Sequence, residues 1–356
     1  MNQPAPPIKY TKKDFTSSKD VKWCPGCGDY AILATVQKTM ADLGRPKDKQ
    51  VVISGIGCSS RFPIYMDTHG FHTIHGRAPT VATGLRVARP DLDVWMVTGD
   101  GDGLSIGGNH LMHAVRRNVE MVVLLFNNRI YGLTKGQYSP TSEQNKVTKS
   151  TPYGSVDAPL NPLLFALAAG ATFVARTWDT NPRHMDAVFK AARQHKGLSL
   201  VEIWQNCVIF NDGAFDNVVD REVKEERLVE LEEGKPILFG KDKSKCLVLD
   251  GLDVVVRDTA LTDPAKILVH NPRSQSPTLA MALAQLSFPD APTPMGILRQ
   301  VERPTYDGDV NEQAAQVLKD RGPGNMDKLL RGSASWKIET DEVFEDAWKP
   351  FVSKKK

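Results

Sequence analysis

The segment from Val94 to Gln137 constrains the fold more than any other part of this sequence. An apolar run at 94–97 leads into Gly-Asp-Gly-Asp-Gly at 99–103, a helix-like segment at 104–117 and a second apolar run at 121–126. Two strands joined through a glycine-rich turn and a helix form a βαβ unit, in which the strands are parallel and the turn lies at their carboxyl edge. The segment therefore predicts an α/β protein with a mostly parallel sheet and helices on both faces.

Polar residues directly follow both of these strands. Asp100 comes after the first strand and Asn128 after the second, so neighbouring strands would place both side chains at one edge of the sheet. Turns that hold a phosphate on backbone N–H groups avoid carboxylates, because like charges repel. Asp100 and Asp102 would therefore repel a phosphate here unless a divalent cation lay between the acids and the phosphate. Carboxylate, amide and carbonyl oxygens suit Mg²⁺. The alternative is an acidic turn that only caps a helix.

The whole segment resembles the thiamine diphosphate motif. It combines Gly-Asp-Gly with an Asn-Asn end, and 26 residues, 102–127, separate Gly101 from Asn128. This resemblance implies that Asp100, Asn128 and the main-chain carbonyl of Ile130 hold Mg²⁺ against the diphosphate.

The composition excludes several classes of protein. With 356 residues the chain suits one large α/β domain plus an extension, or two domains. A net charge of +3, from 45 basic and 42 acidic residues, predicts neither nucleic-acid nor membrane binding. No apolar run approaches the ~20 residues of a membrane helix, and the proline-rich start does not resemble a signal peptide. We expect a soluble, cytoplasmic protein.

The pattern along the chain predicts an arm at 1–20, a domain at 21–215, and an extension at 216–356 that packs on the domain or on a partner. Residues 139–159 are polar and predict a long surface loop, which in a compact domain is often functional. Other predicted elements are helices at 29–43, 81–88, 163–169, 182–193 and 277–286, strands at 51–53, 172–175 and 198–204, and a hairpin at 246–251.

Four of the five cysteines are predicted to converge. Cys24 and Cys27 form a C-x-x-C pair, and Cys58 and Cys207 each follow a predicted strand at the edge that carries Asp100. Without an export signal, disulfides are improbable, and four thiolates bind either zinc or a 4Fe–4S cluster. The alternative is a C-x-x-C helix entry plus two buried cysteines. Structural zinc usually ties two close pairs of ligands, whereas Cys58 and Cys207 are isolated in the sequence, and this favours a cluster over zinc. Cys246 is assigned to the core.

Six motifs occur in order and together resemble the β subunits of two-subunit 2-oxoacid:ferredoxin oxidoreductases over roughly residues 20–290. They are WCPGCGD, GIGCSSR, HTIHGRAPTVATGL, GDGDGLSIGGNH, NNRIYGLTKGQYSPT and QNCVIFN. The GLTKGQ form is most similar to 2-oxoglutarate enzymes. The resemblance implies that the cluster ligands are Cys24, Cys27, Cys58 and Cys207, and that the thiamine diphosphate contacts are Ile56, Gly57, Cys58, Ser59, His75, Gly101, Asp102, Gly132 and Leu133.

The resemblance also assigns Lys135 and Leu133 to substrate binding. A lysine offers three donors and a positive charge to a substrate carboxylate, and the alternative is a solvated loop lysine. The histidines His69, His72 and His75 are spaced too loosely for a metal site. We expect His75 to donate a hydrogen bond to the diphosphate or the substrate.

The implied activity is the oxidative decarboxylation of a 2-oxoacid with coenzyme A, best matched by 2-oxoglutarate to succinyl-CoA and CO₂, with electrons passing through the cluster to ferredoxin. Such enzymes also use a Glu beside the aminopyrimidine, from a pyrimidine-binding domain that this chain lacks. An α subunit is therefore expected, in a dimer of heterodimers. Two alternatives remain open, a non-oxidative decarboxylase half-subunit and a zinc-stabilised, non-catalytic scaffold.

Overall fold

The computed structural model describes residues 9–333 and residue 336. Its contacts divide the chain into two units, 1–310 and 311–356. The elements discussed below lie in the first unit, except that helix α11 (Tyr306–Arg321) crosses the boundary and α12 (Met326–Leu330) belongs to the second.

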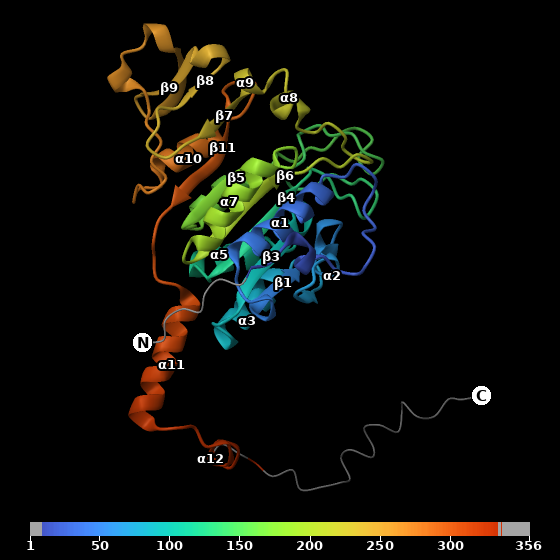
Figure 1. Cartoon of the computed structure of the whole chain (residues 1–356), viewed down its shortest axis with the longest axis vertical. Helices are drawn as coiled ribbons and strands as arrows, with labels where there is room; N and C mark the ends of the chain where they lie inside the picture. The colour runs from blue at the N-terminus through green and yellow to red at the C-terminus, as the bar shows by residue number, and fades with distance from the viewer. Residues whose placement is uncertain (1–8, 334–335, 337–356) are drawn as a thin grey trace, which may run out of the picture. The chain divides into compact units, whose positions relative to one another are not determined.

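The centre of the first unit is an eight-stranded sheet (Figure 1). In spatial order its strands are β2 (His69–His72), β1 (Gln50–Ser54), β3 (Asp93–Gly99), β4 (Met121–Asn127), β6 (Leu198–Trp204), β5 (Phe173–Trp178), β11 (Thr293–Gln300) and β7 (Leu228–Leu231). All neighbouring pairs are parallel except β11 with β5, which are antiparallel. The prediction of a mostly parallel α/β sheet is confirmed.

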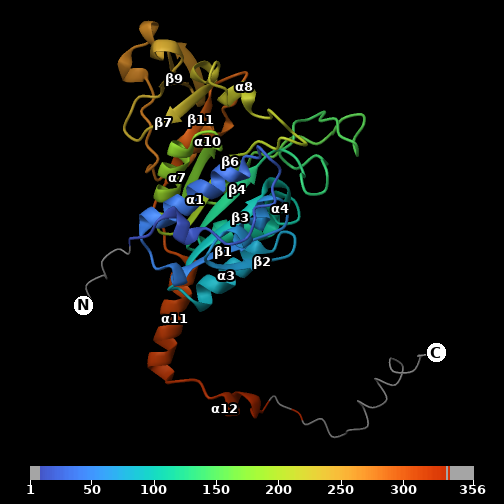
Figure 2. The same ribbon diagram turned by 45° about the vertical axis from the view of Figure 1, so that its right-hand side comes forward.

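Helices cover both faces of this sheet, as predicted. Strands β4 and β6 are buried along their whole length, which is the burial expected of a parallel sheet covered on both sides. One face packs against α1 (Asp29–Leu43) and α7 (Pro182–Gln194), which lie side by side in Figures 1 and 2. The other face packs against α3 (Ala78–Ala88), α5 (Gly108–Arg117), α6 (Pro162–Ala168) and α10 (Thr278–Gln285).

Local sequence signals fix the ends of several helices. The side chain of Asn161 accepts hydrogen bonds from the first backbone N–H groups of α6, and Pro162 follows at the first helical position. Helix α1 ends at Gly44, whose φ of 60° lies in the left-handed region. The remaining short helices are α2 (Phe62–Tyr65), α4 (Asp100–Leu104), α8 (Asp216–Val219) and α9 (Lys224–Arg227).

The predicted helix at 104–117 is instead two helices, α4 and α5, separated by residues 105–107. The break allows two backbones to approach closely, because a Cβ on Gly76 would lie 2.5 Å from the backbone nitrogen of Gly107. Both acids of the Gly-Asp-Gly-Asp-Gly segment thereby become part of α4. The strand β2, at residues 69–72, was predicted as loop; all four of its side chains are exposed, so it carries no apolar pattern.

The chain beyond residue 215 contributes β7 and β11 to the main sheet and also forms a three-stranded sheet of β8 (Leu238–Phe239), β9 (Lys245–Asp250) and β10 (Asp253–Asp258). The predicted hairpin is confirmed, with Gly251 at a φ of 64° between β9 and β10. The division at 215 stays a prediction. Among the residues described, no helix combines the length and apolar character needed to cross a membrane.

Candidate active site

The site lies at the carboxyl edge of four neighbouring parallel strands, β1, β3, β4 and β6. Each strand ends directly before a segment that the sequence analysis singled out. These segments are 55–59 after β1, 100–102 after β3, 128–135 after β4 and 205–207 after β6. Parallel pairing therefore brings together segments that begin at residue 55 and end at residue 207, which are 152 positions apart in the sequence.

Two pockets occupy this edge, and they share a wall. The acidic pocket, of about 60 Å³, is lined by Ile56, Gly57, Cys58, Ser59, His75, Gly99, Asp100, Gly101, Asp102, Asn128, Ile130, Tyr131, Gly132, Leu133 and Thr134. It contains every residue predicted to contact thiamine diphosphate or Mg²⁺. The cysteine cavity, of about 430 Å³, contains all four predicted cluster ligands. The shared wall consists of Cys58, Asn128, Gly132 and Leu133.

Asp100 is buried in the acidic pocket and is held by two hydroxyl groups. It is 2% exposed, and its Oδ2 accepts hydrogen bonds of 2.6 Å from both Ser139 and Thr141. Burial raises the pKa of Asp100, and the two hydroxyl donors act in the opposite direction. Among the residues described, Asp100 has no basic side chain as an ion-pair partner. Its charged form therefore depends on hydroxyl and backbone donors alone, which leaves it suited to a cation.

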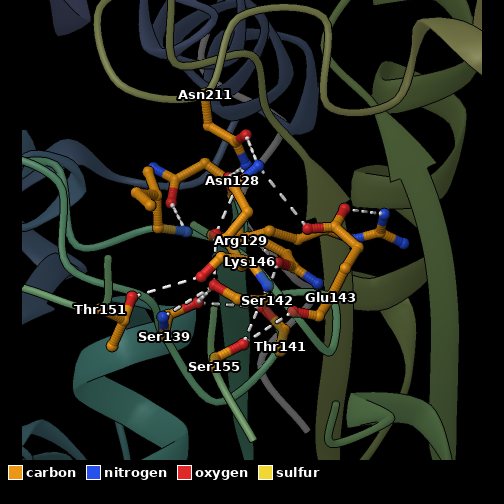
Figure 3. Close-up of polar contacts among 12 residues, drawn as sticks. Asn128, Arg129, Ser139, Thr141, Ser142, Glu143, Lys146, Thr151, Ser155 and Asn211 are labelled. Carbon is orange, nitrogen blue, oxygen red and sulfur yellow. Dashed lines mark hydrogen bonds and ion pairs between the residues drawn. The ribbon is translucent and has the colours of Figure 1, made fainter. Parts of the chain in front are cut away.

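The loop predicted at 139–159 supplies these hydroxyls and is itself tied down by polar contacts (Figure 3). Ser142 donates to the carbonyl oxygen of Arg129 at 2.6 Å, and the guanidinium of Arg129 pairs with Glu143 at 2.7 Å. The length and polar composition of this loop indicate a function from the sequence but identify none of its residues. Ser139 and Thr141 belong to the same motif, NNRIYGLTKGQYSPT, as Lys135. Their position in this motif is the sequence signal that could have identified them as site residues.

Asp102 connects three segments around the acidic pocket. Its Oδ1 accepts a hydrogen bond of 2.8 Å from the backbone of Gly76, and its Oδ2 accepts one of 2.8 Å from Thr98. A Cβ on Gly55 would lie 1.8 Å from that same Oδ2, so only glycine fits at this position. In this arrangement Asp102 holds the turns after β1 and β2 against the end of β3.

Asn128 is positioned by contacts at each of its polar groups. Its Oδ1 accepts from the backbone N–H of Ile130 at 3.2 Å, and its Nδ2 donates to Gln205 Oε1 at 2.9 Å. Its main-chain carbonyl accepts from Asn211 at 2.9 Å, as Figure 3 shows. The next residue, Arg129, has a φ of 55°, which turns the chain sharply at the end of β4. This turn brings Ile130 back toward the acidic pocket.

Tyr131 explains the glycine of the Gly-Asp-Gly turn. The tyrosine hydroxyl donates to the carbonyl oxygen of Gly101 at 2.9 Å. A Cβ on Gly101 would lie 2.2 Å from the tyrosine ring, so a larger residue would displace the ring. Burial raises the pKa of Tyr131, and the charges of Asp100 and Asp102 add to that shift. Tyr131 therefore stays protonated and acts as a hydrogen-bond donor.

The four cysteines surround the cysteine cavity without forming disulfides. A Cβ on Gly132 would lie 3.5 Å from the sulfur of Cys58 and 3.6 Å from that of Cys207. Burial raises the pKa of Cys58 to about 11, and the charge of Asp29 adds to the shift. Cys246 is fully buried in the extension, away from this cavity, in agreement with its core assignment.

The walls of the cysteine cavity are anchored by Trp23 and Gln205. The indole N–H of Trp23 donates to the carbonyl oxygen of Cys58 at 2.7 Å, and its ring contacts Tyr65 edge-on. The side-chain amide of Gln205 donates to the sulfur of Cys27 at 3.2 Å. The sequence analysis named neither residue as functional, although both stand in the quoted WCPGCGD and QNCVIFN motifs.

Lys135 and Leu133 lie in a tight turn beside both pockets. Lys135 lines the cysteine cavity with a φ of 75°, and its backbone N–H bonds to the carbonyl oxygen of Gly132. Leu133 is 51% exposed. His75 lines the acidic pocket, whereas His69 and His72 lie on β2, outside both pockets.

Across residues 9–333, no three His, Cys, Asp or Glu side chains are grouped closely enough to hold a single metal ion. The predicted magnesium set contains one such side chain, Asp100, together with an amide and a carbonyl group. The four thiols surround a cavity rather than one point.

Comparison with known proteins gives consistent matches. Residues 55–203, from the turn after β1 to the end of β6, match the family described as "Thiamine pyrophosphate enzyme, C-terminal TPP binding domain". The chain is 52% identical over 330 residues to 2-oxoglutarate oxidoreductase subunit KorB of Mycobacterium tuberculosis, covering 92% of this chain and 88% of that one. It is 44% identical over 185 residues to 2-oxoglutarate synthase subunit KorB of Archaeoglobus fulgidus, covering 52% and 69%.

A solved structure is similar over nearly the whole length. The 2-oxoglutarate:ferredoxin oxidoreductase from Magnetococcus marinus, with 2-oxoglutarate, coenzyme A and succinyl-CoA bound, superposes with a TM-score of 0.70 at 38% identity. The superposition covers 90% of this chain and 94% of that chain.

Proposed function

Because this chain belongs to the β subunits of the 2-oxoacid:ferredoxin oxidoreductases, we propose that it forms the diphosphate- and cluster-binding half of an enzyme that oxidises 2-oxoglutarate to succinyl-CoA and CO₂. The observation that carries this proposal is the shared wall. The acidic pocket and the cysteine cavity meet at Cys58, Asn128, Gly132 and Leu133, so a carbon-centred reaction and an electron acceptor would lie side by side.

The acidic pocket would hold thiamine diphosphate through Mg²⁺. Asp100, Asn128 and the carbonyl of Ile130 supply the hard oxygen ligands, and Asp100 has only hydroxyl and amide partners around it. Nothing lies within 4 Å of a Cβ placed on Gly57, which leaves room for a ligand over the turn after β1. When bound, thiamine diphosphate supplies the carbon nucleophile for the keto group and holds the electron pair left by the departing CO₂.

The cysteine cavity would hold a 4Fe–4S cluster on Cys24, Cys27, Cys58 and Cys207. Its size supports a group larger than one ion, and structural zinc sites usually tie two close pairs, whereas two of these cysteines stand alone in the sequence. When bound, the cluster supplies a one-electron acceptor next to the reacting carbon.

Lys135 would bind a carboxylate of the substrate, because this residue lines the cysteine cavity close to the shared wall and its side chain carries a positive charge and three N–H donors. Leu133 would contact the apolar part of the substrate, and His75 would donate a hydrogen bond to the diphosphate or the substrate. The backbone turn at 131–137 fixes the spacing between Lys135 and Leu133.

An α subunit would complete the site and supply the pyrimidine-binding half, with the heterodimers themselves pairing. Three large apolar side chains support a covering partner. Ile74, which precedes the pocket residue His75, is 71% exposed, and Leu133 of the shared wall is 51% exposed. Ile106 is 58% exposed and directly precedes Gly107, which packs against Gly76. Ferredoxin would carry the electrons away, and the free thiols suit a reducing cytoplasm.

The substrate is tested with the anaerobically purified α/β complex, coenzyme A and a low-potential electron acceptor. We expect turnover with 2-oxoglutarate to exceed that with pyruvate and with branched-chain 2-oxoacids at least tenfold, and to require coenzyme A. A preference for pyruvate would overturn the substrate assignment. Full activity of this chain without its partner would overturn the shared site.

The cluster is tested by Cys207→Ser, with Cys246→Ser as the matched control outside the cavity. We expect the first variant to lose the broad visible absorption and most of its iron, and the second to keep both. A colourless parent complex that decarboxylates without an electron acceptor would favour the non-oxidative alternative. One zinc, no iron and no bound thiamine diphosphate would favour the scaffold.

A further inference from the structure

One buried side chain, that of Gln205, connects the two pockets. Gln205 directly follows β6 and is 1% exposed. Its Nε2 donates to the sulfur of Cys27 at 3.2 Å, and its Oε1 accepts from Nδ2 of Asn128 at 2.9 Å. A proposed cluster ligand and a proposed magnesium ligand therefore both hydrogen-bond to a single side-chain amide.

The orientation of this amide is fixed from several sides. The backbone N–H of Gln205 continues the strand ladder to the carbonyl of Asn127 at 2.9 Å, and Nε2 also donates to the carbonyl of Asn206 at 2.5 Å. Asn206 in turn binds the C-x-x-C turn, because its carbonyl accepts from the backbone of Gly28 at 3.1 Å. Gln205 is thus held between the end of β4 and the loop that carries Cys27.

An amide suits both contacts, because it carries N–H donors and a carbonyl acceptor on one planar group. An N–H group directed at a thiolate stabilises negative charge on the sulfur, and hydrogen bonds to the sulfurs are among the factors that set the reduction potential of a cluster. Reduction makes a cluster more negative, so this donor favours the reduced form. At its other end, the acceptor fixes the orientation of the Asn128 amide.

We propose that Gln205 is a positioning residue that connects the two cofactor sites, raising the reduction potential of the cluster through Cys27 and orienting Asn128 toward the metal. The inference rests on the proposed function, because it takes the cluster and the metal to be bound where that function places them. Nε2 of Gln205 acts on the cluster and Oε1 acts on Asn128, so substitutions of Gln205 can separate the two effects.

The test compares two variants of Gln205 in the anaerobic α/β complex by iron content, redox titration followed by electron paramagnetic resonance, and Mg²⁺-dependent binding of thiamine diphosphate. Gln205→Met keeps the length of the side chain and removes both hydrogen bonds. We expect the equilibrium between oxidised and reduced cluster to shift tenfold against the reduced form, so that the reduction potential of a one-electron couple falls by 59 mV. We also expect thiamine diphosphate to bind at least tenfold more weakly.

Gln205→Glu keeps an acceptor for Asn128 and removes the N–H donor. We expect its potential to fall at least as far, while cofactor binding stays within about threefold of the parent. Asn211→Ala is the matched control, because the side chain of Asn211 donates to the main chain of Asn128 and, among the residues described, forms no hydrogen bond to a sulfur atom. The substitution keeps the backbone hydrogen bond from Asn211 to Cys207. We expect it to weaken cofactor binding and to leave the potential unchanged.

An unchanged potential in Gln205→Met at the parent's iron content would overturn the inference. Loss of iron in both Gln205 variants alike would also overturn it, because the residue would then only support the fold. These results differ from a failure of the proposed function, in which the parent complex itself would contain no iron.

Discussion

Strand β3 begins and ends at a buried aspartate, and the chain neutralises the two in different ways. Asp93, at the amino end, is 4% exposed and forms ion pairs with Arg193 and, at 3.3 Å, with Arg45. Asp100, just past the carboxyl end, is 2% exposed and is held by the hydroxyl groups of Ser139 and Thr141. The two sites are alike in burial and differ in the charge of their partners.

The neighbouring strand β4 continues the contrast. Glu120 precedes it and lies 3.3 Å from Arg86, which also pairs with the buried Asp307 at 2.8 Å. The carboxyl end of β4 is followed by the neutral residue Asn128. A buried carboxylate without a cationic partner is unfavourable, so an acid whose donors are hydroxyl and backbone N–H groups is suited to a cation from outside the chain. The buried acids of the amino edge have arginine partners within this chain, whereas Asp100 at the carboxyl edge has none among the residues described.

The largest effect is expected from Asp100→Asn, which keeps the shape of the side chain and removes its charge. We expect Mg²⁺-dependent binding of thiamine diphosphate to weaken at least a hundredfold, because the metal loses its only carboxylate ligand in the proposed set. Titration calorimetry with and without Mg²⁺ measures the change, and iron content serves as the control. Loss of iron together with cofactor binding would show that Asp100 supports the fold instead.

A smaller effect, on stability alone, is expected at the amino edge. Arg86→Met removes the guanidinium group from beside Glu120 and Asp307, and breaking a buried ion pair costs about 3–5 kcal/mol. Urea unfolding measures this loss in the free energy of unfolding. Arg89→Met is the control, because its pair with Asp91 is exposed to solvent and exposed ion pairs contribute little to stability. Weaker cofactor binding by folded Arg86→Met would contradict the separation of the two edges.

The contrast between the edges was partly predictable from the sequence. The order of strand, glycine-rich turn, helix and strand can be recognised within one continuous stretch of sequence. It therefore predicted the parallel sheet correctly and placed Asp100 and Asn128 at the same edge of it. The same rule placed Cys58 and Cys207 there, because both follow strands of that sheet. Residues at strand ends are predictable once the strands are known to be parallel.

The missed features depend on contacts between distant parts of the chain. Ser139 and Thr141 reach Asp100 across 39 and 41 positions, and no periodic pattern encodes a loop that folds back. Strand β11 was missed because Pro294 and Gly296 are unfavourable in strands, and a register shift after Ile297 interrupts its pairing. The contact between Gln205 and Cys27 spans 178 positions and appears only in the folded structure.

The smallest effect concerns two histidines at the ends of helix α7: His184, half-buried in its first turn, and His195, buried directly after its last residue. His184 hydrogen-bonds Thr177 at the carboxyl end of β5, and His195 hydrogen-bonds Thr172 just before its amino end. Burial lowers the pKa of both histidines to about 4. The unfolded chain, with pKa values near 6.5, therefore binds more protons between pH 6.5 and 4. Stability is full above pH 6.5 and falls as the pH is lowered, by at most about 1.4 kcal/mol per pH unit for each histidine.

We expect His184→Gln and His195→Gln each to remove about half of this dependence, which urea unfolding at pH 7.0, 6.0 and 5.0 would measure as differences from the parent. The free energy of unfolding of each variant is compared with that of the parent at the same pH, because carboxyl groups also begin to titrate at the acidic end of this range. His69→Gln, at an exposed position on β2, should leave the dependence unchanged. If only His195→Gln flattened the profile, His184 at the carboxyl edge of the sheet would tolerate an added charge. The contrast between the two edges would then extend from the acids to the histidines.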